Sequence, residues 1–202
     1  MAKAKSTAFK NIIVLLVIAL LSVSALAVLN QVTMEPIAKA EEEAKAEIYR
    51  SVYADAASFE EMTGFTGEES SYAPTDESIT LNTVLAAKDA GGNTIGYVVD
   101  ATSANGYGGD VQIAVGISNE GTLTAFSVIS ASETPGLGAK ASEDEFASQF
   151  AGMPAETIAF SKTGKSKPNE IDAISGATIT TTAVTTAVNE AITLFNTMLK
   201  GE

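Results

Sequence analysis

Two short segments of this sequence carry residues whose types and spacing could do chemistry. The first, residues 172–180 (DAISGATIT), combines one carboxylate, three hydroxyl groups and one glycine, and it leads into a helix predicted for residues 180–199. Small residues and the glycine let the backbone approach a ligand closely. The free N–H groups and the dipole at the start of that helix suit an anion such as phosphate. An ordinary Ser/Thr N-cap explains the same residues without a ligand, so both interpretations stay open at this point.

The second segment, residues 132–140 (SETPGLGAK), directly follows a predicted strand. Its proline and two glycines predict a tight, stiff turn, with the polar side chains of Glu133 and Thr134 at the mouth of the turn. Lys140 is the only Lys or Arg in residues 89–161. A plain Pro-Gly turn between a strand and a helix needs no ligand, so this segment is a candidate site on its residue types alone.

The composition limits what either segment can do. The chain of 202 residues contains no Cys, which excludes disulfides, Fe–S clusters and thiolate metal sites, and no His, which excludes His-based triads and most zinc sites. Any redox or group-transfer chemistry therefore depends on a bound cofactor, and we predict no catalytic side chain and no metal site. The net charge of −13 becomes −16 without the first 34 residues, which argues against a nucleic-acid binder.

An uncharged N-terminal stretch predicts a membrane segment. Residues 12–29 form an apolar run that only two serines interrupt, and a helix of this length just crosses a hydrocarbon core of about 30 Å. Positive charges precede the run and acids follow it, so the positive-inside rule places the N-terminus in the cytoplasm and the rest outside. We expect a cytoplasmic stretch at 1–10 and a single-pass helix in the cell (inner) membrane at 11–31. The positive charges are those of Lys3, Lys5 and Lys10.

A cleaved signal peptide is the competing interpretation of the same stretch. Ala25, Leu26 and Ala27 fit an A-x-A cleavage site, and residues 12–21 then serve as the apolar core of the signal. Both interpretations place the bulk of the chain outside the cytoplasm.

The rest of the chain has the pattern of an α+β protein. Helical spacing follows the membrane segment, four alternating segments separated by turn residues predict antiparallel strand pairs, and an apolar stripe predicts a long C-terminal helix. We expect a helical connector with the first strand region at 32–93 and one domain at 94–202. The elements are expected as helices at 36–62, 142–150 and 180–199, and as strands at 78–88, 94–101, 111–117, 123–130 and 156–161.

A family resemblance connects the two candidate segments. Residues 172–178, read as D-x-x-S-G-A-T, resemble the signature of the extracytoplasmic FMN-binding domain that carries its flavin covalently. The turn at 133–138 (ETPGLG) is similar to a second sequence motif of that family. Residues 106–109 (GYGG) are similar to a third, less specific motif, and the three motifs occur in the expected order. The resemblance covers about residues 94–198. It implies an FMN that a flavin transferase, using FAD, joins through its phosphate to the hydroxyl of Thr178.

The resemblance and the residue types together imply a set of site residues. The hydroxyl groups of Ser175 and Thr180 would hydrogen-bond the phosphate, and the turn would offer backbone groups to the flavin ring. Lys140 would stabilise the reduced anionic flavin. Asp172 would be a recognition residue for the transferase, or a local cap, rather than a catalytic base. The other cofactor-binding residues expected beside Thr178 are Gly176, Ala177, Glu133, Thr134, Gly136, Leu137 and Gly138.

Within this family the chain resembles the G subunit of Rnf complexes, which couple ferredoxin and NAD to sodium or proton movement. The C subunit of the sodium-pumping NADH:quinone reductase is the close alternative. The resemblance implies an electron-relaying component and not an independent enzyme, because the chain has neither cluster ligands nor a nucleotide-binding fingerprint. Its partners would be the flavin transferase, the lipid bilayer, a second membrane subunit with covalent FMN, and a pair of membrane subunits that hold an Fe–S cluster.

Two functions of other kinds also stay open. In the first, the chain is an anchored FMN domain of another extracytoplasmic reductase. In the second, it is an anchored structural module without redox chemistry. A flavin that survives denaturation would exclude the structural module, and genomic neighbours would separate the electron-transfer systems.

Overall fold

The computed structural model describes residues 2–67 and 70–201, and the chain divides into two compact units, residues 1–45 and 46–202. The side chains of residues 2–9 lie outside this description. They include Lys3 and Lys5, two of the three lysines on which the predicted membrane orientation rests. Residues 1, 68, 69 and 202 also lie outside the described part of the chain. They belong to the cytoplasmic stretch expected at 1–10, the connector region expected at 32–93 and the domain expected at 94–202.

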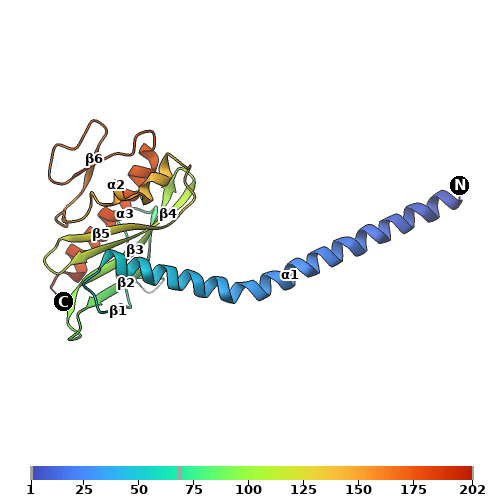
Figure 1. Ribbon diagram of the computed structural model, residues 1–202, viewed down its shortest axis with the longest axis horizontal. Helices are drawn as coiled ribbons and strands as arrows, with labels where there is room; N and C mark the ends of the chain where they lie inside the picture. The colour runs from blue at the N-terminus through green and yellow to red at the C-terminus, as the bar shows by residue number, and fades with distance from the viewer. Residues whose placement is uncertain (1, 68–69, 202) are drawn as a thin grey trace. The chain divides into compact units, whose positions relative to one another are not determined.

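One continuous helix, α1 (Ala2–Val52), forms the N-terminal part of the chain (Figure 1). The apolar side chains of residues 12–29 are exposed, and within the described residues α1 is the one helix long and apolar enough to cross a membrane. The helix passes through Pro36 without ending. The expected membrane segment and the first part of the expected connector are therefore one helix.

The helix predicted at 36–62 is wrong in its last part. Residues Ser58–Glu61 form strand β1, which pairs antiparallel with the end of β2 (Ile79–Lys88). Spacing within a short window cannot reveal this strand, because its hydrogen-bond partners lie more than 20 residues further along the chain.

Five strands form one antiparallel sheet in the order β1-β2-β3-β4-β5. The two long strands β3 (Thr94–Gly106) and β4 (Gly109–Ser118) make the central hairpin, and β5 (Leu123–Ala131) pairs with β4. The four strands predicted in antiparallel pairs are confirmed, and the α+β class with them. The sequence predicts these strands well because turn residues separate them and each contains a buried apolar run.

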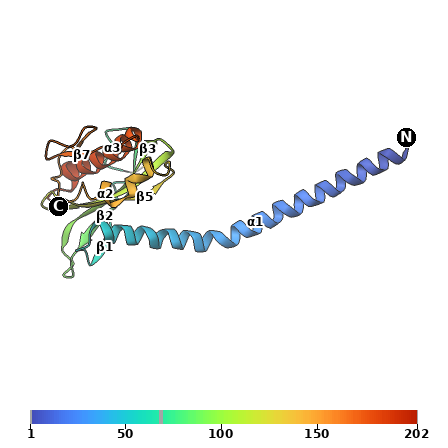
Figure 2. The ribbon, with the colours of Figure 1, turned by 45° about the horizontal axis from the view of Figure 1, so that its top comes forward.

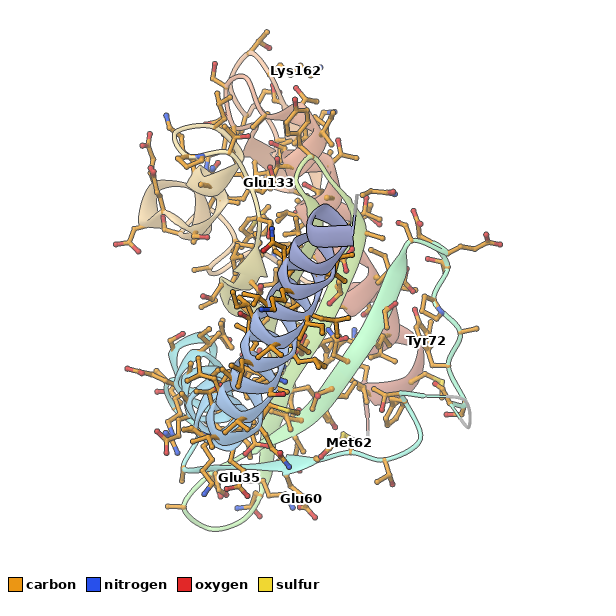
Figure 3. All side chains as sticks on the ribbon, turned by 90° about the vertical axis from the view of Figure 1, so that its right-hand side faces the viewer. Glu35, Glu60, Met62, Tyr72, Glu133 and Lys162 are labelled. Atoms are coloured by element: carbon orange, nitrogen blue, oxygen red, sulfur yellow. The ribbon has the colours of Figure 1, made fainter. Side chains whose placement is uncertain are left out.

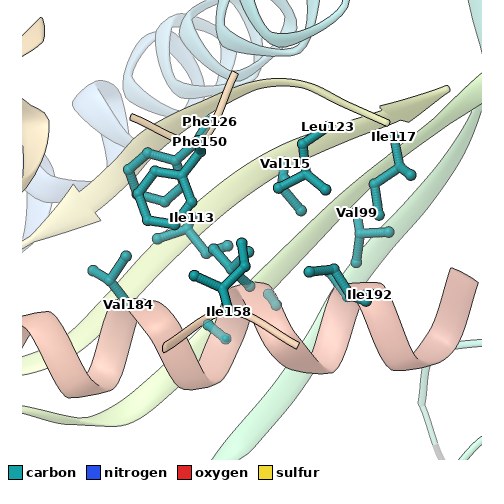
Figure 4. Packing of buried hydrophobic residues seen from close by; sticks show 14 of the residues in the cluster. Val99, Ile113, Val115, Ile117, Leu123, Phe126, Phe150, Ile158, Val184 and Ile192 are labelled. Carbon is teal, nitrogen blue, oxygen red and sulfur yellow. The ribbon is translucent and has the colours of Figure 1, made fainter. Parts of the chain in front are cut away.

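The C-terminal helix α3 (Thr178–Leu194) covers one face of this sheet, and a short π-helical segment, η2 (Phe195–Leu199), continues it. Figure 4 shows Val184 and Ile192 of α3 facing apolar side chains of the central strands, among them Val99, Ile113 and Val115. The predicted apolar stripe is thus confirmed as the face that packs on the sheet.

The last turn of α1 and the residue after it cover part of the other face (Figure 2). Val52 and Tyr53 pack there on Val98, and the Tyr49 hydroxyl donates a hydrogen bond of 2.8 Å to Oδ2 of the buried Asp100. Burial, together with the adjacent carboxylate, raises the pKa of Tyr49 well above its usual value of 10.0. The central strands are therefore buried on both faces.

A second buried carboxylate ties a loop to α3. Glu190 of α3 accepts hydrogen bonds from the hydroxyl of Tyr72, which Figure 3 labels, and from the backbone N–H of Thr75 at 2.8 Å. Burial and this carboxylate raise the pKa of Tyr72. The loop before β2 is thereby fastened to the helix that covers the sheet.

Short elements connect β5 to α3. A 3₁₀ turn, η1 (Gly138–Ser142), precedes the one-turn helix α2 (Asp144–Ala147), so the helix predicted at 142–150 is shorter than expected. The strand predicted at 156–161 is also shorter, since only β6 (Ala159–Ser161) forms. It pairs in parallel with an unpredicted strand, β7 (Glu170–Asp172), which leads into α3.

Candidate functional site

Three segments that are far apart in the sequence line one pocket of about 460 Å³. It is the larger of the two pockets beside the start of α3 and is called the larger pocket below. Because β3, β4 and β5 are antiparallel neighbours, the β3–β4 hairpin and the end of β5 meet at one end of the sheet. The start of α3 lies against the same end. The lining residues are Tyr107 of the hairpin, Glu133, Thr134, Leu137 and Gly138 of the turn, and Gly176, Ala177, Thr178, Ile179 and Thr180 at the helix start.

Glu133, labelled in Figure 3, joins these three segments through its buried carboxylate. Its Oε1 accepts hydrogen bonds from the backbone N–H of Tyr107 at 2.8 Å and of Gly108 at 3.3 Å. Its Oε2 accepts a hydrogen bond of 2.9 Å from the hydroxyl of Thr180. Only 9% of Glu133 and 0% of Thr180 is exposed. The carboxylate therefore fixes the hairpin, the turn and the helix start against one another.

Two glycines allow the turn and the helix start to pack this closely. A Cβ atom at Gly138 would collide with Glu133 Oε2 and would lie 2.6 Å from Thr180 Oγ1. Gly176 has a φ of +78°, in the left-handed region that favours glycine, and a Cβ atom there would lie 3.1 Å from a methyl carbon of Leu137. Any side chain at position 138 would push the carboxylate away from the helix.

The start of α3 has free hydrogen-bond donors. The N-cap residue is Ala177, and no side chain in the described part of the chain caps the helix. Among the described residues, the backbone N–H groups of Thr178, Ile179 and Thr180 have no hydrogen-bond acceptor. The interpretation of this segment as a Ser/Thr N-cap is therefore wrong, and the three donors remain available to an anion.

Thr178 itself is half-buried and lines the larger pocket. Its hydroxyl makes no hydrogen bond to any residue that the structure describes, whereas the hydroxyls of Thr181 and Thr182 bond to the carbonyls one turn earlier. The Thr181 hydroxyl also accepts the backbone N–H of Ile174 at 3.1 Å. The loop before the helix is thus fixed by Thr181, and the hydroxyl of Thr178 is left available for another partner.

Apolar side chains surround the mouth of the larger pocket. Tyr107 is 70% exposed, Ile179 is 52% exposed and Leu137 is 43% exposed, although each carries a large apolar group. Pockets for small organic ligands are lined mainly by such groups, with a few polar groups that fix orientation. The arrangement suits a planar ring with an anionic tail.

Three of the residues predicted for the site line a neighbouring hollow instead. This smaller pocket of about 220 Å³ is lined by Lys140, Asp172 and Ser175, together with residues of α2. The carboxylate of Asp172 accepts the backbone N–H of Lys165 at 2.5 Å, and its backbone N–H donates to the side-chain carbonyl of Gln149 at 2.7 Å. Asp172 thus holds the loop before β7. Gly136 is exposed at the tip of the turn, with a φ of +76°.

The structure adds two residues to the larger pocket that were not predicted for it. Tyr107 belongs to the GYGG hairpin, which the resemblance marked only weakly, and its 26-residue distance from Glu133 hides their contact in the sequence. Ile179 is a large apolar residue exposed in the first turn of α3. The sequence offers one indication of this role: Ile179 is apolar but falls outside the apolar stripe of α3 that packs on the sheet.

These residues fit an FMN. The free N–H groups at the start of α3 match its phosphate, and the apolar mouth of the pocket matches its ring. The volume of about 460 Å³ lies in the range of small-molecule sites. Thr178 lines the same pocket at the helix start.

Comparison with known proteins agrees with this geometry. Residues 106–193 match the family model of the FMN-binding domain. The chain is 36% identical to the G subunit of the Na⁺-translocating ferredoxin:NAD⁺ oxidoreductase complex of Acetobacterium woodii, over 95% of this chain and 93% of that protein. It is 33% identical to the G subunit of the ion-translocating oxidoreductase complex of Methanosarcina acetivorans, over 91% of this chain and 92% of that protein.

A solved structure has a similar fold. The C subunit of the Na⁺-translocating NADH-quinone reductase from Parabacteroides distasonis matches 59% of this chain and 63% of its own, with a TM-score of 0.50 and 25% identity. The G-subunit relatives match nearly the full length at higher identity. The chain belongs to the G-subunit family of ion-translocating ferredoxin:NAD⁺ oxidoreductase complexes, and its C-terminal part is an FMN-binding domain.

Proposed function

We propose that this chain is the membrane-anchored flavoprotein that relays electrons within an ion-translocating ferredoxin:NAD⁺ oxidoreductase complex, and that its FMN is covalently bound to Thr178. The larger pocket carries this proposal, because it brings residues of the ETPGLG turn and the last three residues of the D-x-x-S-G-A-T segment to one site. The bound flavin supplies one- and two-electron chemistry that no side chain of this cysteine-free chain can supply.

The start of α3 holds the phosphate end of the cofactor in this proposal. The free N–H groups of residues 178–180 bind the phosphate oxygens, and the helix dipole favours their negative charge. During attachment, the Thr178 oxygen forms a bond to the flavin-side phosphorus of FAD. The pyrophosphate bond breaks, AMP leaves, and the hydroxyl proton is lost to solvent. The chain's own contribution is to present an unbonded hydroxyl beside three phosphate donors.

The turn, the hairpin and Ile179 of α3 hold the ring end in this proposal. Tyr107, Leu137 and Ile179 offer apolar surface at the mouth of the pocket, which removes water from the faces of the ring. Attachment through the phosphate leaves the ring itself unmodified, so that its edge remains accessible to partner cofactors. The role of these residues is to orient the ring and not to transfer electrons themselves.

The long helix α1 supports a place in the membrane. In the proposed arrangement, the N-terminus is cytoplasmic and the FMN domain faces the outer side, as the positive charges before the apolar run favour. The protein then exchanges electrons with a second membrane subunit that carries covalent FMN and with membrane subunits that hold an Fe–S cluster. A flavin transferase acts on this chain during maturation.

The decisive experiment is Thr178→Ala in the full chain, co-expressed with a flavin transferase. We expect complete loss of covalent flavin, measured by fluorescence on a denaturing gel and by intact mass, because only a hydroxyl at this position forms the ester. Thr178→Ser keeps a hydroxyl and should retain the flavin. Thr182→Ala is the matched control, since Thr182 lies one turn later in α3 and is exposed. Covalent flavin on the Thr178→Ala protein would refute the attachment site.

A further inference from the structure

We infer that Glu133 is a positioning residue that locks the pocket and, through its buried negative charge, lowers the reduction potential of the flavin. The inference rests on the proposed function, because it requires the flavin ring to lie in the larger pocket. It changes the role of Glu133 from a polar group that contacts the cofactor to a charge held by the protein itself.

The hydrogen bonds of Glu133 support a positioning role. An ionised carboxylate only accepts hydrogen bonds, and here both oxygens already accept them from the protein, from two backbone N–H groups and from the Thr180 hydroxyl. These donors come from the hairpin and the helix start, which form the other two walls of the pocket. Glu133 therefore does not need the cofactor to satisfy it, and the walls are fixed before the cofactor arrives.

The packing around the carboxylate shows that this site is built for it. Gly138 is buried, and a Cβ atom there would collide with Glu133 Oε2. A Cβ atom at Gly106 would lie 2.9 Å from Glu133 Oε1. Both oxygens are thus surrounded closely by backbone, and 9% of the residue remains exposed. Such a charge is weakly screened by solvent, so its field extends into the adjoining pocket.

No cation neutralises this charge within the part of the chain that the structure describes. The ion pairs found there join Lys88 to Glu60 and Lys167 to Glu170. The positive ends of dipoles that meet it are the backbone N–H groups of Tyr107 and Gly108 and the Thr180 hydroxyl. The free N–H groups at the start of α3 bind the cofactor phosphate in the proposed function. Reduction of the flavin takes up two electrons and one proton to give the anionic reduced form. A fixed negative charge beside the ring disfavours that form.

The test is Glu133→Gln in the full chain, flavinylated by a co-expressed transferase and titrated with dithionite. Glutamine keeps an acceptor for the N–H groups and offers an N–H to the Thr180 oxygen, while the charge is lost. We expect the flavin that is attached to this variant to have a higher midpoint potential. A tenfold change in the ratio of oxidised to reduced flavin corresponds to about 30 mV for a two-electron couple. Glu120→Gln is the control, because it removes the same charge from an exposed turn at the opposite end of β4.

A second measurement separates positioning from charge. In the flavin-free Thr178→Ala background, Glu133→Ala should lower the melting temperature clearly, because three donors lose their acceptor, whereas Glu133→Gln should change it little. An unchanged potential in Glu133→Gln would overturn the inference, and so would an equal shift in Glu120→Gln. A folded Glu133→Gln protein that accepts no flavin would also overturn it. Absence of covalent flavin from the unsubstituted chain would instead refute the proposed function.

Discussion

The two pockets that flank the start of α3 differ in what lines them. The larger pocket has one buried carboxylate, free helix N–H groups and an apolar mouth. The smaller pocket has exposed charged side chains, among them Lys140, Glu145 and Asp172. One segment, residues 172–180, contributes to both pockets, with Asp172 and Ser175 on one side and residues 176–180 on the other. A single motif therefore presents two distinct surfaces.

The difference suggests two separate tasks. A closely packed pocket with an apolar mouth suits a cofactor that stays bound. An exposed, charged hollow suits brief contact with another protein, since exposed charges guide encounter more than they add affinity. We expect variants of the larger pocket to change the cofactor or the fold, and variants of the smaller pocket to change the attachment reaction or very little.

Gly138→Ala should have the largest effect on stability. The added methyl group has no space beside Glu133 Oε2 and Thr180 Oγ1, and such overpacking costs about 1–3 kcal/mol. Thermal unfolding of the full chain in detergent measures the loss, and flavin attachment should fall with it. Ala139→Ser, at a neighbouring and less buried position, is the control and should be nearly neutral. If Gly138→Ala is as stable as the control, the carboxylate is not held as described.

Asp172→Asn should separate attachment from folding. The asparagine oxygen still accepts the backbone N–H of Lys165, so we expect the free energy of unfolding to change by less than about 0.5 kcal/mol. Loss of the charge should slow flavin attachment about tenfold or more if the transferase reads this carboxylate, measured as covalent flavin against time. Normal attachment in Asp172→Asn combined with failure in Asp172→Ala would mean that Asp172 acts only as a local cap.

Lys140→Ala should have the smallest effect. The sequence predicts that this cation stabilises the reduced flavin, so its removal should lower the potential. The structure places Lys140 at the smaller pocket with an exposed side chain, where solvent and salt screen its charge. We therefore expect a downward shift that is smaller than the upward shift of Glu133→Gln and that shrinks further at high salt. A larger shift than that of Glu133→Gln would reverse the assignment of the two pockets.

Much of the fold follows from the sequence, and the exceptions have physical causes. The strands β2 to β5 and the helix α3 each bury a long apolar row, which leaves a clear period in the sequence. Strands β1 and β7, which were not predicted, and β6, which is shorter than predicted, have only three or four residues, too few for a period. They form because a partner strand elsewhere in the chain supplies their hydrogen bonds. Such elements depend on the tertiary fold and not on their own residues.

The candidate site was also predictable from the sequence only in part. Residue types pointed to both segments, but the turn at 133–138 and the helix start are nearly 40 residues apart. Only the sheet topology brings them to one pocket. The separation of Ser175 and Lys140 from that pocket depends on the left-handed turn at Gly176 and on the direction of η1. The spacing of residues in the sequence does not predict the direction of the Ser175 side chain or of the Lys140 side chain.

The space left by Gly138 has an evolutionary consequence. Gly138, Glu133 and Thr180 touch within one buried cluster, so the effect of a substitution at one position depends on the residues at the other two. A larger residue at 138 collides with the carboxylate at 133, and a shorter side chain at 133 leaves three donors without an acceptor, so either change alone gives a less stable protein. The drift of these three positions is therefore constrained, even though none of them carries an electron.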